Sequence, residues 1–204
     1  MSGRRASQKA KLRATMLAGA ARLFEKQGYA ATTFDEIAAE AGVGVATVYK
    51  YFNSKQGIVI ALLEPDLSSM LARAQRVLER PSSDPAASMV ALLSAYRNLG
   101  GRNWASRELL RLTVYPGIGN AGQLTDLVRD AEAKTQAQIR ALLAAHRYAG
   151  RLARGLPLAD ATAVIFALLN QHFAMYLADA DLRFTQMFRR LARCVRLVFA
   201  DWRN

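Results

Sequence analysis

Apolar residues recur every three or four positions along most of this chain, and no run with the two-residue alternation of a half-buried strand stands out. Residues 158–178 are apolar almost all round, so a helix there needs cover on more than one side. Proline and glycine gather at a few interruptions between segments of helical length. The pattern therefore predicts an all-α protein. Its clearest stripe lies in the last segment and consists of Phe184, Met187, Phe188, Leu191, Val195, Val198 and Trp202.

Residues 32–55 combine two short helical patterns around a glycine. Thr33 followed by Glu36 fits a capping box, so a helix should begin at Phe34. Gly42 stands where a residue in the left-handed conformation commonly ends a helix. The chain should therefore turn sharply after this first short helix.

A second short helix should follow the turn. Gly44 is a tolerable N-cap, and the inward positions Val48 and Phe52 are four residues apart. The outward positions end in Tyr-Lys-Tyr, which a helix buried on all sides would not carry. Two helices that cross steeply through a tight turn can present the second helix to DNA, so DNA binding is the first functional hypothesis. A short helical hairpin inside a core is the alternative.

The sequence here resembles the DNA-binding domain of the TetR family of transcriptional regulators. The resemblance covers about residues 10–60 and implies a three-helix helix-turn-helix domain over residues 1–56. A connecting helix that starts near Lys55 would join it to a larger helical bundle, over residues 57–204, for ligand binding and dimerisation. Besides a basic N-terminal helix, the matching residues are Gly28-Tyr29, Thr32-Thr33, Ile37-Ala38, Ala41-Gly42-Val43, Thr47-Val48-Tyr49, Tyr51-Phe52 and Ser54-Lys55.

Two departures from the family pattern matter. Gly44 and Val45 stand where the family often has serine and lysine, so family operators cannot be transferred to this chain. Gly57 stands where an acidic residue normally follows the lysine of the fourth helix, which predicts a weaker first turn.

If the second short helix enters the major groove, its N-terminal residues meet base edges and its flanks meet phosphates. Val45 and Ala46 lack hydrogen-bonding side chains, so we expect contact with thymine methyl groups. Lys50 has guanine O6 and N7 as its best base target, with a phosphate as the alternative. Thr47 offers either a methyl group or a hydroxyl to a base. The resemblance implies contacts with the DNA backbone for Tyr49, Tyr51 and Lys55, and for Thr33 at the start of the first short helix. The predicted DNA-binding residues are Thr33, Gly44, Val45, Ala46, Thr47, Tyr49, Lys50, Tyr51 and Lys55.

The formal net charge of +12 is unevenly distributed. Residues 1–56 contain nine Lys or Arg and four Asp or Glu, and the five basic residues between positions 4 and 13 account for the whole excess. The helix-turn-helix core is itself neutral. Residues 1–10 are therefore predicted to be a flexible basic arm that follows phosphates or enters a minor groove. A solvated tail without function is the alternative.

Export and membrane insertion are disfavoured by the sequence. The apolar stretch 14–21 is short for a signal core and belongs to a helical stripe. Residues 161–178 carry no formal charge, but their polar side chains favour a helix buried in a bundle or dimer over a membrane span. We expect a cytoplasmic protein with no membrane partner. Its single cysteine, Cys194, excludes an intrachain disulfide and should be a packed, unreactive thiol.

No catalytic constellation or metal-ligand spacing is visible, and His146 and His172 stand alone, so we expect neither enzyme activity nor a cofactor or metal. The resemblance implies a homodimer through the last two helices and a repressor that a small molecule releases from a palindromic operator. The alternative is a ligand-independent architectural or non-specific DNA-binding protein. A mixed aromatic and polar effector pocket is predicted from Tyr96, Trp104, Tyr115, Phe166, Asn170, His172, Phe173 and Tyr176, although each alone is more often a core residue.

Overall fold

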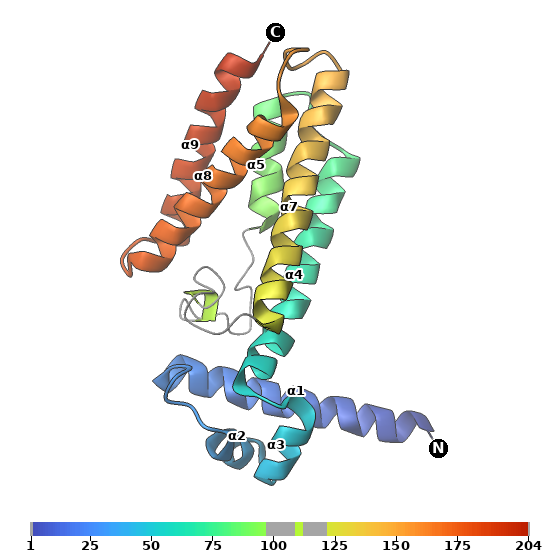
Figure 1. Cartoon of the computed structure of the whole chain (residues 1–204), viewed down its shortest axis with the longest axis vertical. Helices are drawn as coiled ribbons and strands as arrows, with labels where there is room; N and C mark the ends of the chain where they lie inside the picture. Colours follow the sequence, from blue (N-terminus) through green and yellow to red (C-terminus); the bar gives the residue numbers. More distant parts are fainter. Residues whose placement is uncertain (1, 97–108, 112–121, 204) are drawn as a thin grey trace. The chain divides into compact units, whose positions relative to one another are not determined.

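A computed structural model describes residues 2–96, 109–111 and 122–203, and all regular structure in these ranges is helical (Figure 1). The predicted all-α class is therefore confirmed. Two residues of the predicted effector pocket, Trp104 and Tyr115, lie outside the described residues. The helices are α1 (Ser2–Gln27), α2 (Phe34–Ala41), α3 (Val45–Phe52), α4 (Lys55–Glu79), α5 (Pro85–Ala95), α7 (Gln123–Tyr148), α8 (Leu158–Ala178) and α9 (Phe184–Trp202).

The chain divides into two compact units. Among the described residues, the first unit contains 2–66, 109–111 and 122–128, and the second contains 67–96 and 129–203. The division falls inside α4 and inside α7, and α4 itself continues through Pro65. The domain boundary predicted after residue 56 lies earlier, in the first turn of α4.

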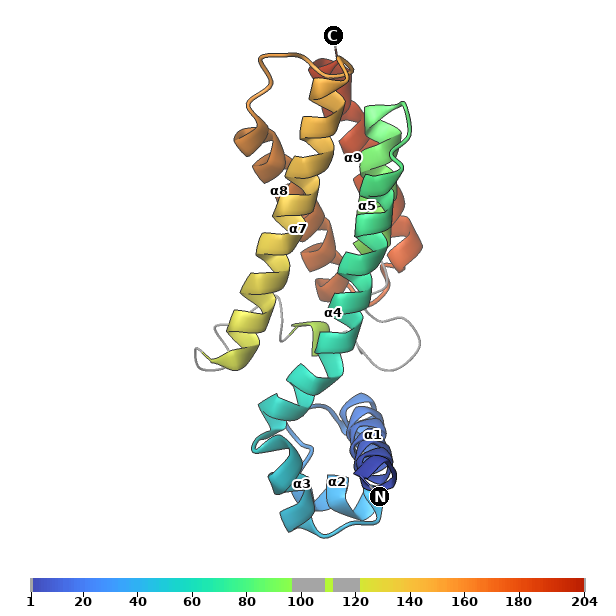
Figure 2. The ribbon, with the colours of Figure 1, turned by 90° about the vertical axis from the view of Figure 1, so that its right-hand side faces the viewer.

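In the first unit, α1, α2, α3 and the start of α4 lie together (Figure 2). Apolar side chains from these helices form a buried core that holds the unit together. α1 packs against α2, and α2 packs against α3. Each helix contributes side chains from one face, as an amphipathic helix requires. The buried side chains include Met16, Ala20, Phe24, Phe34, Ile37, Val48, Phe52, Ile58 and Leu62.

The start of α1 differs from the prediction. α1 begins at Ser2, so residues 2–10, predicted as a flexible arm, are helical. No glycine or proline interrupts the sequence between Gly3 and Gly19, and its Ala, Lys, Arg and Leu residues are strong helix formers. The prediction of a flexible arm rested on the charge of this segment, whereas its helix propensity determines its structure.

The second unit is a helical bundle in which one glutamine joins three helices. The Tyr96 hydroxyl donates to Gln138 Oε1 at 3.0 Å, and Gln138 Nε2 donates to the Leu71 carbonyl oxygen at 3.0 Å. Gln138 thereby links α7 to the end of α5 and to α4. The guanidinium of Arg73 in α4 adds a bond of 3.3 Å to the Ala95 carbonyl oxygen at the end of α5. These bonds fix the relative positions of α4, α5 and α7.

The predicted stripe of α9 is confirmed at its centre, where Met187, Leu191 and Val195 are buried. Phe199, which was not in the predicted stripe, is also buried and continues this line at the same four-residue interval. The remaining predicted members, Phe184, Phe188, Val198 and Trp202, are half-buried. α9 packs against both α8 and α5, so its apolar face serves two neighbours.

Candidate nucleic-acid interface

The predicted capping box at the start of α2 is confirmed. The Glu36 amide donates to the Thr33 hydroxyl at 3.3 Å, and the Thr33 amide donates to the Glu36 carboxylate at 2.8 Å. Hydrogen bonds from the Gln27 side chain, and then from the backbone and hydroxyl of Thr33, hold the pKa of Glu36 below its usual range. The carboxylate thus stays charged at the positive end of α2. A phosphate bound by Thr33 would have to share this place with Glu36.

The turn between α2 and α3 also has the predicted geometry. Gly42 adopts the left-handed conformation at φ 65°, and the Val43 amide donates to the Ala38 carbonyl oxygen at 2.9 Å. This pattern satisfies the last carbonyl groups of α2 and turns the chain at once. Gly44 then caps α3 through its backbone alone, because it has no side chain to accept a hydrogen bond.

α3 buries one face and leaves the other open, as predicted. Val48 and Phe52 are buried in the first unit, whereas Ala46, Tyr49 and Lys50 are exposed. Among the other predicted contact residues of α3, Val45, Thr47 and Tyr51 are half-buried, and Gly44 before the helix is exposed. The arrangement leaves a helix surface of about two turns available to a partner.

Tyr49 is held by an aromatic contact although the residue remains 54% exposed. Its ring centroid lies 4.3 Å from that of the buried Phe34, in an edge-to-face arrangement at 70°. Such pairs are favourable and restrict the ring orientation. The aromatic contact therefore orients Tyr49 on the open surface of α3.

Lys55, predicted to contact the DNA backbone, makes two hydrogen bonds inside its own unit. Its ammonium donates to the carbonyl oxygens of Tyr29 at 2.9 Å and Ala30 at 3.1 Å. It also lies 4.8 Å from the centre of the Tyr29 ring. Because an ammonium has three donors, one N–H remains for a phosphate.

The close packing between the end of α3 and the start of α4 explains why residue 57 is a glycine. A Cβ at this position would overlap the carbonyl oxygen of Phe52, so the acidic residue usual in the family has no room here. The Ser54 hydroxyl accepts from the Gly57 amide at 3.0 Å and caps the first turn of α4. Asn53 between the helices has a φ of 56°, a conformation that asparagine tolerates better than most residues. The predicted weakness of this turn is thus partly offset by its cap.

The residues predicted for an effector pocket make several separate contacts. Burial raises the pKa of the Tyr96 phenol, whose hydroxyl is already bonded to Gln138. On α8, the ring of Tyr176 lies 6.2 Å from Phe173 and 5.3 Å from Phe184 of α9. Phe166 is half-buried and Asn170 is exposed. The set as an effector site stays a prediction.

His172, another of these residues, faces Cys194. Its Nδ1 lies 2.8 Å from the Leu168 carbonyl oxygen, which can only accept, so Nδ1 carries the proton. Its Nε2 then faces Cys194 Sγ at 3.9 Å. Cys194 is half-buried between α8 and α9, a position that agrees with a packed thiol.

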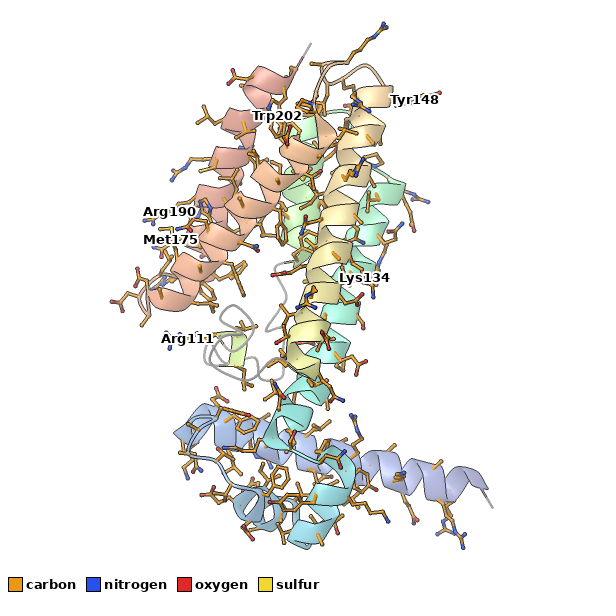
Figure 3. The ribbon with its side chains drawn as sticks, viewed as in Figure 1. Arg111, Lys134, Tyr148, Met175, Arg190 and Trp202 are labelled. Carbon is orange, nitrogen blue, oxygen red and sulfur yellow. The ribbon has the colours of Figure 1, made fainter. Side chains whose placement is uncertain are left out.

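One pocket of about 530 Å³ contains none of the residues predicted to bind an effector. It is lined by Ala144, Arg147, Tyr148 and Arg154, at the C-terminal end of α7 and in the following loop. Figure 3 shows Tyr148 at the end of α7, and its side chain is 97% exposed. This open hollow is lined by two arginines and lies at a helix end, so a prediction based on aromatic and polar residues of the apolar helices does not include it.

α8 and α9 leave apolar side chains uncovered. In the part of the chain that the structure describes, α8 is the one helix long and apolar enough to cross a membrane by length and composition, and 22% of its most apolar window is buried. Val164 and Met175 of α8 are 42% and 41% exposed, and Leu197 of α9 is 74% exposed. Met175 and Arg190 project from the outer side of the α8–α9 pair (Figure 3).

Comparison with known sequences identifies the helix-turn-helix part of the first unit. Residues 16–62 match the sequence profile of bacterial regulatory proteins of the TetR family. Over 54 residues the chain is 46% identical to YvkB, an uncharacterized HTH-type transcriptional regulator of Bacillus subtilis. The matched region is 26% of this chain and 29% of that protein, so the chain spans under a third of this relative. The predicted helix-turn-helix DNA-binding domain is confirmed.

Comparison with solved structures extends the likeness to the whole fold. A putative transcriptional regulator from Saccharomonospora viridis, in complex with choline, superposes with a TM-score of 0.73 and 20% identity, over 92% of this chain and 96% of that one. The regulator FadR from Bacillus subtilis, in complex with stearoyl-CoA, superposes with a TM-score of 0.69 and 16% identity, over 89% of this chain and 96% of that one. At these identities the likeness shows the fold, which confirms a helical C-terminal part behind the helix-turn-helix.

Proposed function

We propose that this chain, which belongs to the TetR family of bacterial regulatory proteins, is a sequence-specific transcriptional regulator that responds to a small molecule. The supporting observation is the α2–Gly42–α3 arrangement, in which a fixed turn and two buried side chains present the open face of α3. α3 lies in the major groove and reads bases with its N-terminal residues. The protein acts in the cytoplasm, as a repressor that leaves its operator when the effector binds.

The exposed chemistry of α3 favours a half-site that contains thymine. Val45 and Ala46 offer only methyl groups, and the thymine C5-methyl is their matching partner in the major groove. Lys50 is exposed and supplies the charged contact, to guanine or to a phosphate. Replacement of thymine by uracil removes only the methyl group. Binding should therefore weaken at the contacted thymines.

Two copies of the chain bind one operator, and α8 and α9 form the interface. The uncovered apolar side chains of these helices support this assignment, since a second copy would remove them from water. An isologous dimer pairs the same surface of both copies, so it reads a palindromic site. The last two helices therefore set the distance between the two copies of α3.

The effector binds in the second unit and weakens operator binding through the dimer. The effector and the operator must lower the affinity for each other by the same factor, because a coupling free energy between two sites is reciprocal. Choline and stearoyl-CoA occur in structures of similar TM-score to this chain, so the fold does not select the ligand. The residues predicted to line the site point to a modest apolar molecule with some hydrogen-bonding capacity. No catalytic step, cofactor or metal is part of this function.

Competition by non-specific DNA separates this proposal from a ligand-independent protein that coats DNA through its positive charge. A regulator should retain its palindrome against about a thousandfold excess of random duplex or more. A coating protein would be displaced in proportion to the competitor. Binding is followed by fluorescence anisotropy of a labelled palindrome at fixed salt, because electrostatic binding depends steeply on salt. Proportional displacement would overturn the proposal.

A further inference from the structure

The first half of α1 is an exposed helix with a strongly positive surface. Residues 3–15 are exposed except for the half-buried Leu12, and burial in the core begins at Met16. Residues 2–24 contain no acidic side chain. The basic extension, as we name residues 3–13, carries Arg4, Arg5, Lys9, Lys11 and Arg13.

Three of these cations form one row. Arg5, Lys9 and Arg13 follow each other at four-residue intervals, so they lie on the same side of the helix, about 6 Å apart along its axis. Arg4 and Lys11 lie on the opposite side, since the helix turns by about 100° at each residue. The extension therefore has two basic sides of different orientation.

The row of Arg5, Lys9 and Arg13 is turned toward the C-terminal end of α3. The Lys9 ammonium lies 5.8 Å from the centre of the Tyr51 ring, and the Arg13 guanidinium carbon lies 5.6 Å from the centre of the Phe52 ring. Both distances are within the range of cation–π attraction. The extension is thus attached to the same helix that carries the proposed base contacts.

We propose that the basic extension binds the phosphate backbone of the duplex that flanks the half-site, through the side that carries Arg5 and Lys9. This inference rests on the proposed function, because it takes α3 to lie in the adjacent major groove. Tyr51 is a predicted backbone contact and lies directly beside Lys9. The row therefore continues the line of contacts that starts on α3.

The helical state decides which part of DNA is bound. An α-helix with side chains is about 10–12 Å across, whereas the minor groove is about 6 Å wide, so the extension stays outside that groove. Phosphate contacts carry no base information, so the extension adds affinity and leaves specificity unchanged. Its eleven residues span roughly 16 Å, equal to about five base pairs of flanking duplex.

Two double variants of equal charge test the proposal. Arg5→Gln with Lys9→Gln removes one arginine and one lysine from the side that faces α3, and Arg4→Gln with Lys11→Gln removes the same pair from the other side. Affinity is measured against salt, on the selected palindrome with long flanks and with flanks trimmed to the half-sites. The slope of the logarithm of the binding constant against the logarithm of the salt concentration should decrease in magnitude by about two for each bound subunit in the Arg5/Lys9 variant. In the Arg4/Lys11 control it should decrease by less than half of that.

Trimmed flanks should weaken the wild type and the Arg4/Lys11 control, but not the Arg5/Lys9 variant. Equal slopes for the two variants, or a wild type insensitive to flank length, would overturn the proposal while preference for the palindrome persisted. Failure of the proposed function is distinguishable, because the wild type would then show no preference for any sequence.

A helix-breaking variant tests the rigid state separately. Ser7→Pro keeps all five cations but interrupts the helix between Arg5 and Lys9. It should lose the flank-dependent affinity as the Arg5/Lys9 variant does, with the specificity ratio unchanged. Two results would show a flexible arm and contradict the proposal. One is full flank-dependent affinity in Ser7→Pro, and the other is a wild type that loses its flank-dependent affinity when a minor-groove binder such as netropsin is added.

Discussion

The side-chain nitrogen of Lys55 lies 2.9 Å from the carbonyl oxygen of Tyr29 and 4.8 Å from the centre of the Tyr29 ring. Lys55 is the first residue of α4, and Tyr29 belongs to the segment that joins α1 to α2. This contact joins the segment before α2 to the first residue of the helix that follows α3, and so closes the α2–α3 segment across its two ends. It also fixes the start of α4 directly after α3, so the orientation of α3 depends on it.

Lys55→Met should destabilise the chain by about 2 kcal/mol, because it removes charge-assisted hydrogen bonds to the carbonyl groups of Tyr29 and Ala30. Denaturant unfolding measures this loss. Lys50→Met on the exposed side of α3 is the matched control and should change stability by no more than about 0.5 kcal/mol. Equal stabilities of the two variants would show that the Lys55 contacts do not hold the domain.

Gly57→Ala should also destabilise the chain, by about 1–3 kcal/mol, since its Cβ overlaps the Phe52 carbonyl oxygen. The sign of the change in stability is informative, because alanine is otherwise more favourable than glycine in a helix by about 1 kcal/mol. Gly3→Ala in the open part of α1 meets no neighbouring atom and is the control. We expect it to preserve or raise stability in the same unfolding experiment. A stabilised Gly57→Ala would contradict the tight joint.

The helix-turn-helix was predictable because each of its steps is local. Thr33 and Glu36 are three residues apart, which is the spacing of a capping box. Gly42 can adopt the left-handed conformation because glycine has no Cβ, and this is known from the residue type alone. Gly57 was not predictable, because the carbonyl group that excludes a side chain there comes from the backbone of Phe52 across a turn. The hydrogen bonds of Lys55 to Tyr29 and Ala30 were missed for a different reason, since they join residues far apart in the chain.

The stability of the second unit should fall as pH decreases below about 6.5. His146 is 2% exposed, and neither ring nitrogen has a hydrogen-bond partner among the described residues. Burial, aided by Arg151 and opposed by Asp84, lowers the pKa of His146. The unfolded chain therefore takes up the proton first, and the free energy of unfolding decreases from pH 7 toward pH 5.5.

His146→Phe should flatten this dependence, because it removes the titrating group and keeps an aromatic ring of similar size. The control His172→Gln, at the other histidine of the chain, should retain it. Unfolding in denaturant at several pH values measures both. A wild-type stability that stays constant or rises from pH 7 to pH 5.5 is incompatible with a neutral buried His146.

The proposed dimer should dissociate when charge is placed on the uncovered side of α8. Val164→Glu together with Met175→Glu would bury two unpaired carboxylates, which should raise the dimer dissociation constant by more than about a hundredfold. Sedimentation equilibrium measures the change. Tyr148→Glu at the end of α7 replaces a 97% exposed side chain and should leave the dimer intact. Unchanged association of the double variant would place the interface elsewhere.

Long-range packing limited the prediction of the second unit. Periodicity located α9 and its buried residues, but it could not show that Tyr96 donates its hydroxyl to Gln138 from a different helix. Likewise, the hollow beside Arg147 and Tyr148 forms where α7 meets the following loop, and no spacing of residues in the sequence predicts it. These features depend on which helices become neighbours, which the apolar pattern alone does not specify.

The central claim is that α3, presented by a dimer, reads a particular palindrome. Selection of bound sequences from a random DNA pool tests it most directly. We predict an inverted repeat whose half-sites contain thymine and whose centres lie about one helical turn, or a multiple of it, apart. A pool that shows no enriched sequence after repeated selection, although the protein still binds DNA, would contradict the claim.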